Sequence, residues 1–173
     1  AGYVKIREFI KILQQKANAD VQASELESIF FDKSLHATSL YADTRKVLQD
    51  LVRSNVDIGI FSTGDKEFQL QKIATLKDLF PENHTHIFVD KREGLADVFS
   101  QYKGTHLYLV DDFPAILYEA KKMDKTISTV WIKRDDQGSP QVLLEDFPQI
   151  ADFIPDYTIK QLDEILTCIK EWN

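Results

Sequence analysis

The chain has 173 residues, of which 43% are hydrophobic, 28% charged and 11% aromatic, a composition that excludes a disordered chain and a coiled rod. No run approaches the roughly 18 apolar residues of a membrane span, and no basic-then-apolar leader opens the chain, so we expect a soluble, cytoplasmic protein with no membrane partner. The net charge of -7 disfavours a broad attraction to nucleic acid. Any phosphate group that this protein handles must therefore be held locally.

The first forty residues predict a helical hairpin. Apolar residues recur at helical spacing over residues 3–16, namely at Val4, Ile6, Phe9, Ile10 and Leu13. A second helix toward Phe31 is predicted to begin at a capping box, in which the side chains of Ser24 and Glu27 bond each other's backbone N–H groups. We expect residues 1–40 to form a small helical cap and residues 41–173 an α/β core domain.

From about residue 43 the pattern alternates between helices and short apolar strands. The predicted strands cover 56–61, 86–89, 107–110, 127–132 and 157–159. The first predicted helix begins at Asp43 or Thr44. Further helices are predicted over 66–80, 95–102, 113–123 and from Leu162 to Ile169, with a polar, turn-rich stretch at 135–140. Apolar strands separated by helices indicate a doubly wound parallel sheet, Rossmann-like, with helices on both faces.

Polar residues collect where three of these strands end. The first strand leads into residues 62–65 (Ser-Thr-Gly-Asp), the second into Asp90-Lys91, and the third ends in Asp111-Asp112. In a parallel sheet these ends share one edge, which is where open α/β folds bind their ligands. The pattern predicts that the three groups lie together.

These residue types suit phosphoryl transfer. Neighbouring carboxylates at Asp111 and Asp112 repel unless a cation offsets them, and Mg²⁺ prefers such hard oxygen ligands. The Ser62 hydroxyl and the N–H groups that follow it, where a helix begins, can bind a phosphate oxygen, and Lys91 supplies a positive charge. Each piece also has a purely structural interpretation: Asp112 as a helix N-cap, residues 62–64 as an ordinary turn, and Lys91 as a solvated side chain.

The ordered set resembles three of the four motifs of the haloacid dehalogenase-like hydrolases, which are mostly Mg²⁺-dependent phosphatases. Residues 58–64 (Ile-Gly-Ile-Phe-Ser-Thr-Gly) look like motif II, Lys91 is similar to the motif III lysine, and residues 109–112 (Leu-Val-Asp-Asp) resemble motif IV. The resemblance implies catalytic roles for Ser62 and Lys91 and binding of Mg²⁺ by Asp111 and Asp112. It also implies phosphate binding by Ser62, Thr63, Gly64 and Lys91, with Asp65 and Asp90 in support.

Motif I of that family, an Asp-x-Asp segment whose first aspartate is the nucleophile, does not occur in this sequence. The nearest candidate is Asp32, but Ser34 stands where the second aspartate belongs, and the preceding capping box indicates the end of a helix rather than of a strand. In family members with a cap after motif I, the order is strand, helical hairpin and core. We therefore expect the nucleophile upstream of Ala1; the alternative is a natural non-catalytic relative.

The function expected from this resemblance is hydrolysis of a small phosphorylated metabolite through an aspartyl phosphate. The alternative is a catalytically inactive protein that binds a phosphorylated ligand or a partner. A P-loop and a dinucleotide-binding loop have no matching glycine pattern, and too few residues follow Asp112 for a response-regulator receiver. His84 and His86 are predicted to be exposed polar residues rather than zinc ligands, and Cys168 to be buried. The sequence does not indicate an oligomeric state.

Overall fold

The computed structural model describes residues 5–16, 22–32, 34–35, 40–134 and 147–170. The chain divides into two compact units, Ala1–Lys91 and Arg92–Asn173, which are described separately. The predicted division into a cap over 1–40 and a core over 41–173 stays a prediction. No helix among the described residues is long and apolar enough to cross a membrane.

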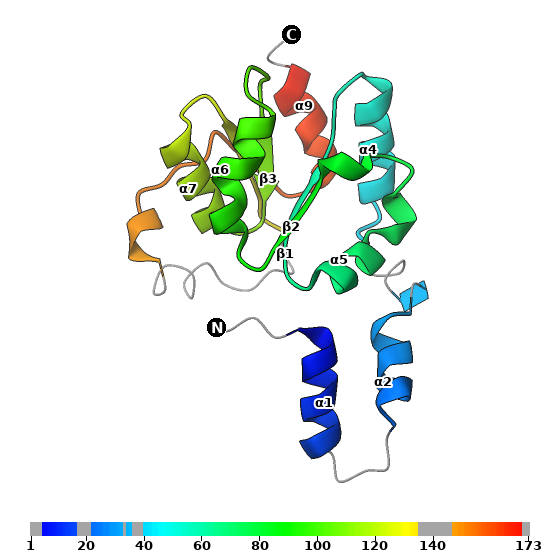
Figure 1. Cartoon of the computed structure of the whole chain (residues 1–173). Helices are drawn as coiled ribbons and strands as arrows, with labels where there is room; N and C mark the ends of the chain where they lie inside the picture. Colours follow the sequence, from blue (N-terminus) through cyan, green and yellow to red (C-terminus); the bar gives the residue numbers. More distant parts are fainter. Residues whose placement is uncertain (1–4, 17–21, 33, 36–39, 135–146, 171–173) are drawn as a thin grey trace. The chain divides into compact units, whose positions relative to one another are not determined.

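The first unit contains a helical hairpin and a two-stranded parallel sheet (Figure 1). Its elements are α1 (Ile6–Lys16), α2 (Ala23–Phe30), α4 (Thr44–Arg53), β1 (Ile60–Thr63), α5 (Lys66–Lys72), two 3₁₀ turns (Ala74–Leu76 and Glu82–His84) and β2 (Thr85–Phe88). β1 pairs with β2 in parallel, with Ser62 opposite Ile87 and Thr63 opposite Phe88.

The hairpin forms as predicted, but its second helix begins differently. α2 starts at Ala23, and the backbone N–H of Gln22 donates to the Glu25 carboxylate at 3.3 Å, so the predicted Ser24 capping box is wrong. The Glu27 carboxylate is instead engaged by Arg7 of α1 at 2.9 Å. The two helices also meet through the Phe9 and Phe30 rings, whose centroids lie 6.0 Å apart. The Glu27 carboxylate thus contacts another helix instead of the start of its own helix.

Part of the predicted pattern around α4 and α5 is also corrected. α4 buries Val47 and Leu51, whereas the apolar Val52 is 42% exposed. The single helix predicted over 66–80 ends at Lys72 and continues as a 3₁₀ turn. The guanidinium of Arg45, on α4, bonds the carbonyl of Thr75 and pairs with the Asp78 carboxylate at 2.7 Å. These contacts join α4 to the segment after α5, where the helix is interrupted.

The second unit is an α/β layer built on a three-stranded parallel sheet with strand order β3-β4-β5 (Figure 1). Its elements are α6 (Lys91–Gln101), β3 (Tyr108–Asp111), α7 (Pro114–Met123), β4 (Ser128–Ile132), two 3₁₀ turns (Pro148–Ile150 and Leu162–Glu164), β5 (Tyr157–Ile159) and α9 (Ile165–Lys170). α6 begins four residues before its predicted start at residue 95. The predicted polar stretch at 135–140 lies outside the described residues.

Burial in the second unit follows from the apolar composition of its strands. Val130 at the centre of the sheet and Leu117 and Ala120 on α7 have no exposed surface. α7 packs on both β3 and β4. Parallel strands need such cover because both of their faces are apolar. The predicted α/β class with Rossmann-like parallel strands is confirmed.

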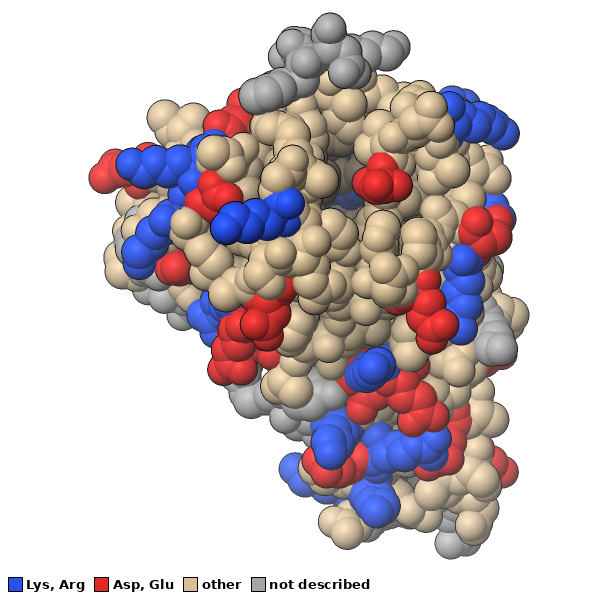
Figure 2. Space-filling model, turned by 45° about the horizontal axis from the view of Figure 1, so that its top comes forward, with Lys and Arg blue, Asp and Glu red and all other residues tan. Residues whose placement is uncertain are grey.

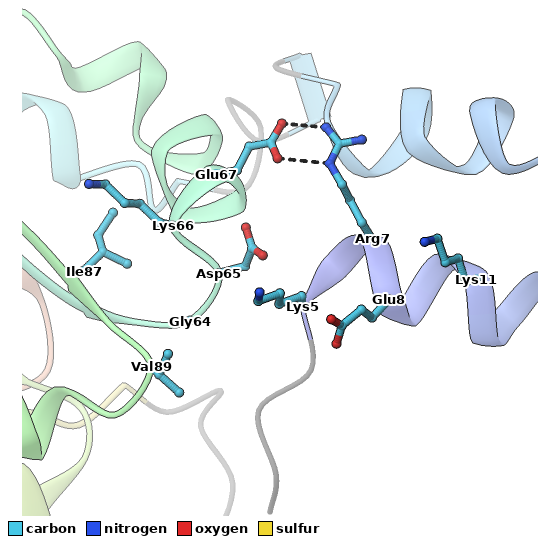
Figure 3. Close-up of a pocket in the computed structure, with 10 residues that line it drawn as sticks. All are labelled: Lys5, Arg7, Glu8, Lys11, Gly64, Asp65, Lys66, Glu67, Ile87 and Val89. Carbon is cyan, nitrogen blue, oxygen red and sulfur yellow. Dashed lines mark hydrogen bonds and ion pairs between the residues drawn. The ribbon is translucent and has the colours of Figure 1, made fainter.

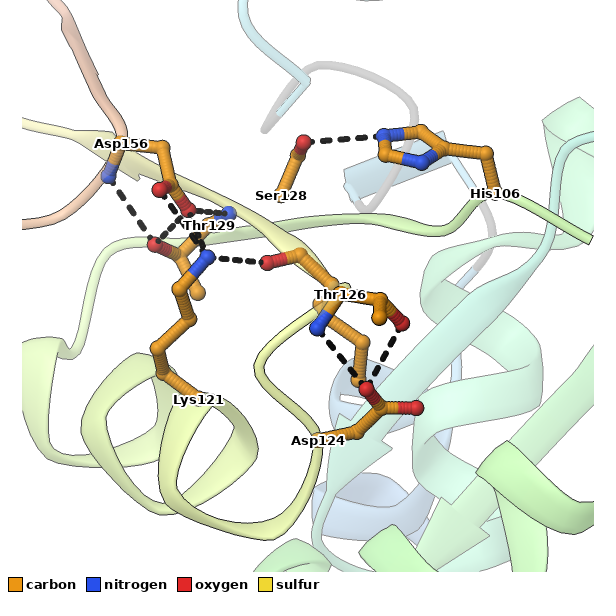
Figure 4. A network of polar contacts seen from close by, with 8 residues as sticks. His106, Lys121, Asp124, Thr126, Ser128, Thr129 and Asp156 are labelled. Carbon is orange, nitrogen blue, oxygen red and sulfur yellow. Dashed lines mark hydrogen bonds and ion pairs between the residues drawn. The ribbon is translucent and has the colours of Figure 1, made fainter.

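A polar network ties α7 to the sheet of the second unit (Figure 4). The Asp156 carboxylate accepts hydrogen bonds of 2.8 Å from both the backbone N–H and the hydroxyl of Thr129, which has no exposed surface. The Lys121 ammonium donates to the same carboxylate at 2.8 Å and to the carbonyl of Ile127 at 2.8 Å. Burial raises the pKa of Asp156, but the hydrogen bonds from Lys121 and Thr129 outweigh it and hold this pKa below its ordinary value.

Replacement of Asp156 by alanine is expected to lower the free energy of unfolding by about 1–2 kcal/mol at pH 7, since Lys121 and Thr129 lose a charged acceptor at a partly exposed site. Asp163→Ala, at an exposed position, is the control. Folding lowers the pKa of Asp156, so the stability that its carboxylate contributes is present above the ordinary pKa of 3.8. This stability is lost as the pH falls through the pKa of Asp156 in the folded protein. Urea unfolding measures the effect, and equal losses in both variants would contradict it.

Candidate functional site

A tight turn leaves β1 in the first unit and leads into α5. Gly64 adopts φ +136°, and a Cβ at this position would lie 2.8 Å from the Gln69 side-chain nitrogen. The Gly64 N–H donates to the carbonyl of Phe88 at 2.8 Å, and the Gln69 amide donates to the carbonyl of Thr63 at 2.9 Å. The positive φ and the close approach of the Gln69 side chain would both strain a side chain at residue 64, so the turn requires glycine.

The pairing of β1 with β2 brings Ser62, Thr63 and Lys91 to one end of the sheet. The backbone N–H of Lys91 donates to the Thr63 hydroxyl at 3.3 Å, just beyond the last paired residues of the two strands. Ser62 is half-buried, and Thr63 is exposed. The structure thus places the predicted phosphate-binding residues of the first unit on two adjoining strand ends. Sequence reasoning missed that Thr63 connects them.

The helix that follows this turn contributes less than the sequence suggested. α5 has seven residues, and the carboxylate of its N-cap, Asp65, accepts from the backbone N–H of Phe68 at 3.0 Å. One of the helix's first donors is therefore used within the protein. The end of α5 therefore offers fewer donors to a ligand than the sequence suggested, and phosphate binding by Ser62, Thr63, Gly64 and Lys91 stays a prediction.

Asp111 and Asp112 lie at the end of β3 in the second unit. Asp111 is 6% exposed, and its carboxylate accepts from the backbone N–H of Phe113 at 2.9 Å. Asp112 is exposed, and its carbonyl accepts from the Trp131 indole N–H at 3.2 Å. The N-cap of α7 is Phe113, so the structural interpretation of Asp112 as the helix cap is wrong. The carboxylate that supports the start of this helix belongs to Asp111.

The two adjacent carboxylates fit Mg²⁺ in their chemistry. They supply hard oxygen donors at a strand end, and Mg²⁺ commonly takes one or two carboxylates with water and substrate oxygens as its remaining ligands. The described residues contain no group of three or more His, Cys, Asp or Glu side chains that could hold a metal ion. Ser62 and Lys91 belong to the first unit and the two aspartates to the second. That the four residues form one site stays a prediction.

Asp32 does not occupy a strand end. It follows α2, and its carboxylate accepts from the backbone N–H of Ser34 at 2.8 Å and from its hydroxyl at 2.7 Å. This is the local bonding typical of aspartate in a turn. The prediction that Asp32 closes a helix is confirmed.

The remaining candidates are explained by packing. Cys168 is 7% exposed, as predicted. A ring nitrogen of His84 lies 3.3 Å from the carbonyl of Ile58, and His84 and His86 are both half-buried rather than exposed, because they flank and enter β2. Burial lowers the pKa of His86, and the neighbouring His84 lowers it further. His86 therefore favours its neutral form in the folded protein.

The lowered pKa of His86 predicts acid sensitivity. Below its ordinary pKa of 6.5 the unfolded chain binds a proton more readily than the folded protein, so stability falls as the pH decreases through this range. The urea concentration at the midpoint of unfolding is measured at about pH 7.5 and 5.5. We expect it to differ less between the two pH values in His86→Gln than in the wild-type protein. The same decline in both proteins would contradict the assignment.

Comparison with known proteins supports the fold. No protein-family model and no curated protein matches this chain. A solved crystal structure from Burkholderia xenovorans LB400, described as a haloacid dehalogenase-like hydrolase, is similar to it with a TM-score of 0.68 at 24% sequence identity. The match covers 91% of this chain and 71% of that one. The chain therefore has the same α/β fold as that protein.

Proposed function

We propose that this protein is a Mg²⁺-dependent phosphatase of the haloacid dehalogenase-like type, which hydrolyses a small phosphorylated metabolite in the cytoplasm. The observation that carries the proposal is the paired end of β1 and β2, where the Lys91 backbone N–H donates to the Thr63 hydroxyl beside Ser62. Two hydroxyls at one sheet edge, next to a lysine residue, suit the negatively charged oxygens of a phosphoryl group. The similarity in fold to a haloacid dehalogenase-like hydrolase supports the same class of reaction.

Each residue has a defined role in the proposed reaction. The Ser62 hydroxyl donates a hydrogen bond to a phosphoryl oxygen, and the Lys91 ammonium offsets the charge that develops there. Asp111 and Asp112 hold Mg²⁺, which when bound stabilises negative charge on the phosphoryl oxygens. By the resemblance, an aspartate carboxylate forms a bond to phosphorus while the alcohol leaves, and water then hydrolyses the aspartyl phosphate. That aspartate belongs to an Asp-x-Asp motif, which this sequence does not contain.

The second candidate is a protein that binds a phosphorylated ligand without turning it over. The 173 residues contain no Asp-x-Asp, the motif on which hydrolysis depends in the resemblance. The two candidates share phosphate binding and differ in hydrolysis. The two are separated by 4-nitrophenyl phosphate hydrolysis measured on the chain together with whatever residues its coding sequence places upstream of Ala1, alongside binding of inorganic phosphate: binding with turnover supports the phosphatase, and binding alone supports the second candidate.

The metal assignment predicts that Mg²⁺ raises the midpoint of thermal unfolding, because an ion that binds the folded state preferentially stabilises it. The double variant Asp111→Asn/Asp112→Asn is expected to lose this response. Asp163→Asn, an exposed carboxylate of the same unit, is the matched control and should keep it. An unchanged Mg²⁺ response in the double variant would rule out these two aspartates as the metal ligands.

The phosphate assignment predicts weaker binding of inorganic phosphate after Lys91→Met, by about tenfold or more, because a charged partner is lost. Ser62→Ala should have a smaller effect in the same direction, since it removes one neutral donor. Lys77→Met, an exposed lysine of the same unit, is the control. Isothermal titration in the presence of Mg²⁺ measures the affinities, and equal affinities in Lys91→Met and Lys77→Met would contradict the role of Lys91.

A further inference from the structure

A cleft of about 530 Å³ lies within the first unit, between α1 and the turn that leaves β1 (Figure 3). Gly64 and Asp65 line it on the side of the turn, directly after Ser62 and Thr63 in the chain. Ile87 of β2 and Val89, which follows β2, also line this side. The cleft therefore adjoins the proposed phosphate-binding residues, and its volume is that of a site for a small molecule.

The opposite wall of the cleft is charged. Lys5, Arg7, Glu8 and Lys11 line it, all from α1 or the residue directly before it. Figure 3 shows the Lys5 side chain reaching from the start of α1 toward the Gly64–Asp65 turn. Neither Lys5 nor Lys11 forms an ion pair within the part of the chain that the structure describes. Their ammonium charges are thus available to a ligand in the cleft.

Arg7 holds this wall in place. Its guanidinium donates to both carboxylate oxygens of Glu67, on α5, at 3.2 and 2.7 Å, and pairs with Glu27, on α2, at 2.9 Å. It also lies 5.1 Å from the centroid of the Phe31 ring. The hydrogen bonds that Arg7 donates to Glu67 and then to Glu27 raise its pKa. Since Lys5 precedes Arg7 by two residues and Lys11 follows it by four, these contacts hold α1, and with it both lysines, on this side of the cleft.

The lining of the cleft contains four basic and three acidic side chains. Once Arg7 and Glu67 are paired with each other, the lining retains the ammonium groups of Lys5, Lys11 and Lys66 and the carboxylates of Glu8 and Asp65. The Asp65 carboxylate already accepts a backbone hydrogen bond as the N-cap of α5. In Figure 3 the Lys66 side chain points away from α1, so Lys5 and Lys11 are the cations on the helical wall that a ligand meets.

We propose that Lys5 and Lys11 determine specificity by binding a second anionic group, a carboxylate, on the phosphorylated substrate. The inference rests on the proposed function, because the phosphoryl group must first occupy the site beside Ser62. A substrate with an uncharged leaving group gains nothing from the two ammonium groups. A phosphorylated carboxylic acid gains charge-assisted hydrogen bonds at the opposite wall of the cleft.

The test compares two series of phosphonates, which mimic phosphate esters and are not hydrolysed. Phosphonoacetate, 3-phosphonopropionate and 4-phosphonobutyrate carry a carboxylate at increasing distance, and ethyl-, propyl- and butylphosphonate are their uncharged-tail counterparts. Binding to the full 173-residue chain is measured by isothermal titration with Mg²⁺ present. We expect at least one carboxylate compound to bind about tenfold more tightly than its counterpart, with a preference that falls as salt is added.

The double variant Lys5→Gln/Lys11→Gln is expected to lose this preference while its affinity for the alkylphosphonates stays unchanged. Lys16→Gln, on the same helix, is the matched control and should keep the preference. The inference is overturned if the wild-type protein shows no preference at any chain length, or if the double variant retains it. If neither series binds, the phosphate site itself is absent, which overturns the proposed function as well.

Discussion

The parallel pairing of β1 with β2 is the constraint on which the candidate site depends. Because the two strands run in the same direction and in register, Thr63 and Phe88 end side by side, and the residues after them emerge at one edge. The bond from the Gly64 N–H to the Phe88 carbonyl and the bond from the Lys91 N–H to the Thr63 hydroxyl extend this pairing beyond the strands. Ser62 and Lys91 are therefore positioned by backbone geometry.

Charged side chains in both units connect helices to neighbouring segments. In the first unit Arg7 joins α1 to α2 and α5, and in the second Lys121 of α7 meets Asp156 before β5. The surroundings of these contacts differ: Arg7 is half exposed, whereas the Asp156 carboxylate also accepts from the fully buried Thr129. Figure 2 shows basic and acidic side chains next to one another on the face in view. Exposed ion pairs each contribute little stability, so the pairs of Arg7 with Glu27 and Glu67 mainly orient the helices.

The sequence predicted the elements better than their boundaries. The strand at 107–110 is displaced by one residue from the observed β3 (Tyr108–Asp111), but the strand at 56–61 proved to be Ile60–Thr63. An apolar run shows which residues suit burial, and it does not show where pairing with another strand begins. Likewise, Ser24 and Glu27 have the spacing of a capping box, yet Glu27 binds Arg7 of another helix. Local rules failed where a distant side chain competed for the same group.

The sequence by itself determined the α/β class, the helical hairpin and the polar residues at three strand ends, because periodicity and strand order are properties of the local chain. Only the tertiary structure decided that Thr63 bonds Lys91, that Asp111 rather than Asp112 supports the start of α7, and that α1 lines a cleft beside Gly64. These features join residues far apart in the chain or depend on the conformation of one turn. No periodic pattern encodes such contacts, since they arise when separate elements pack.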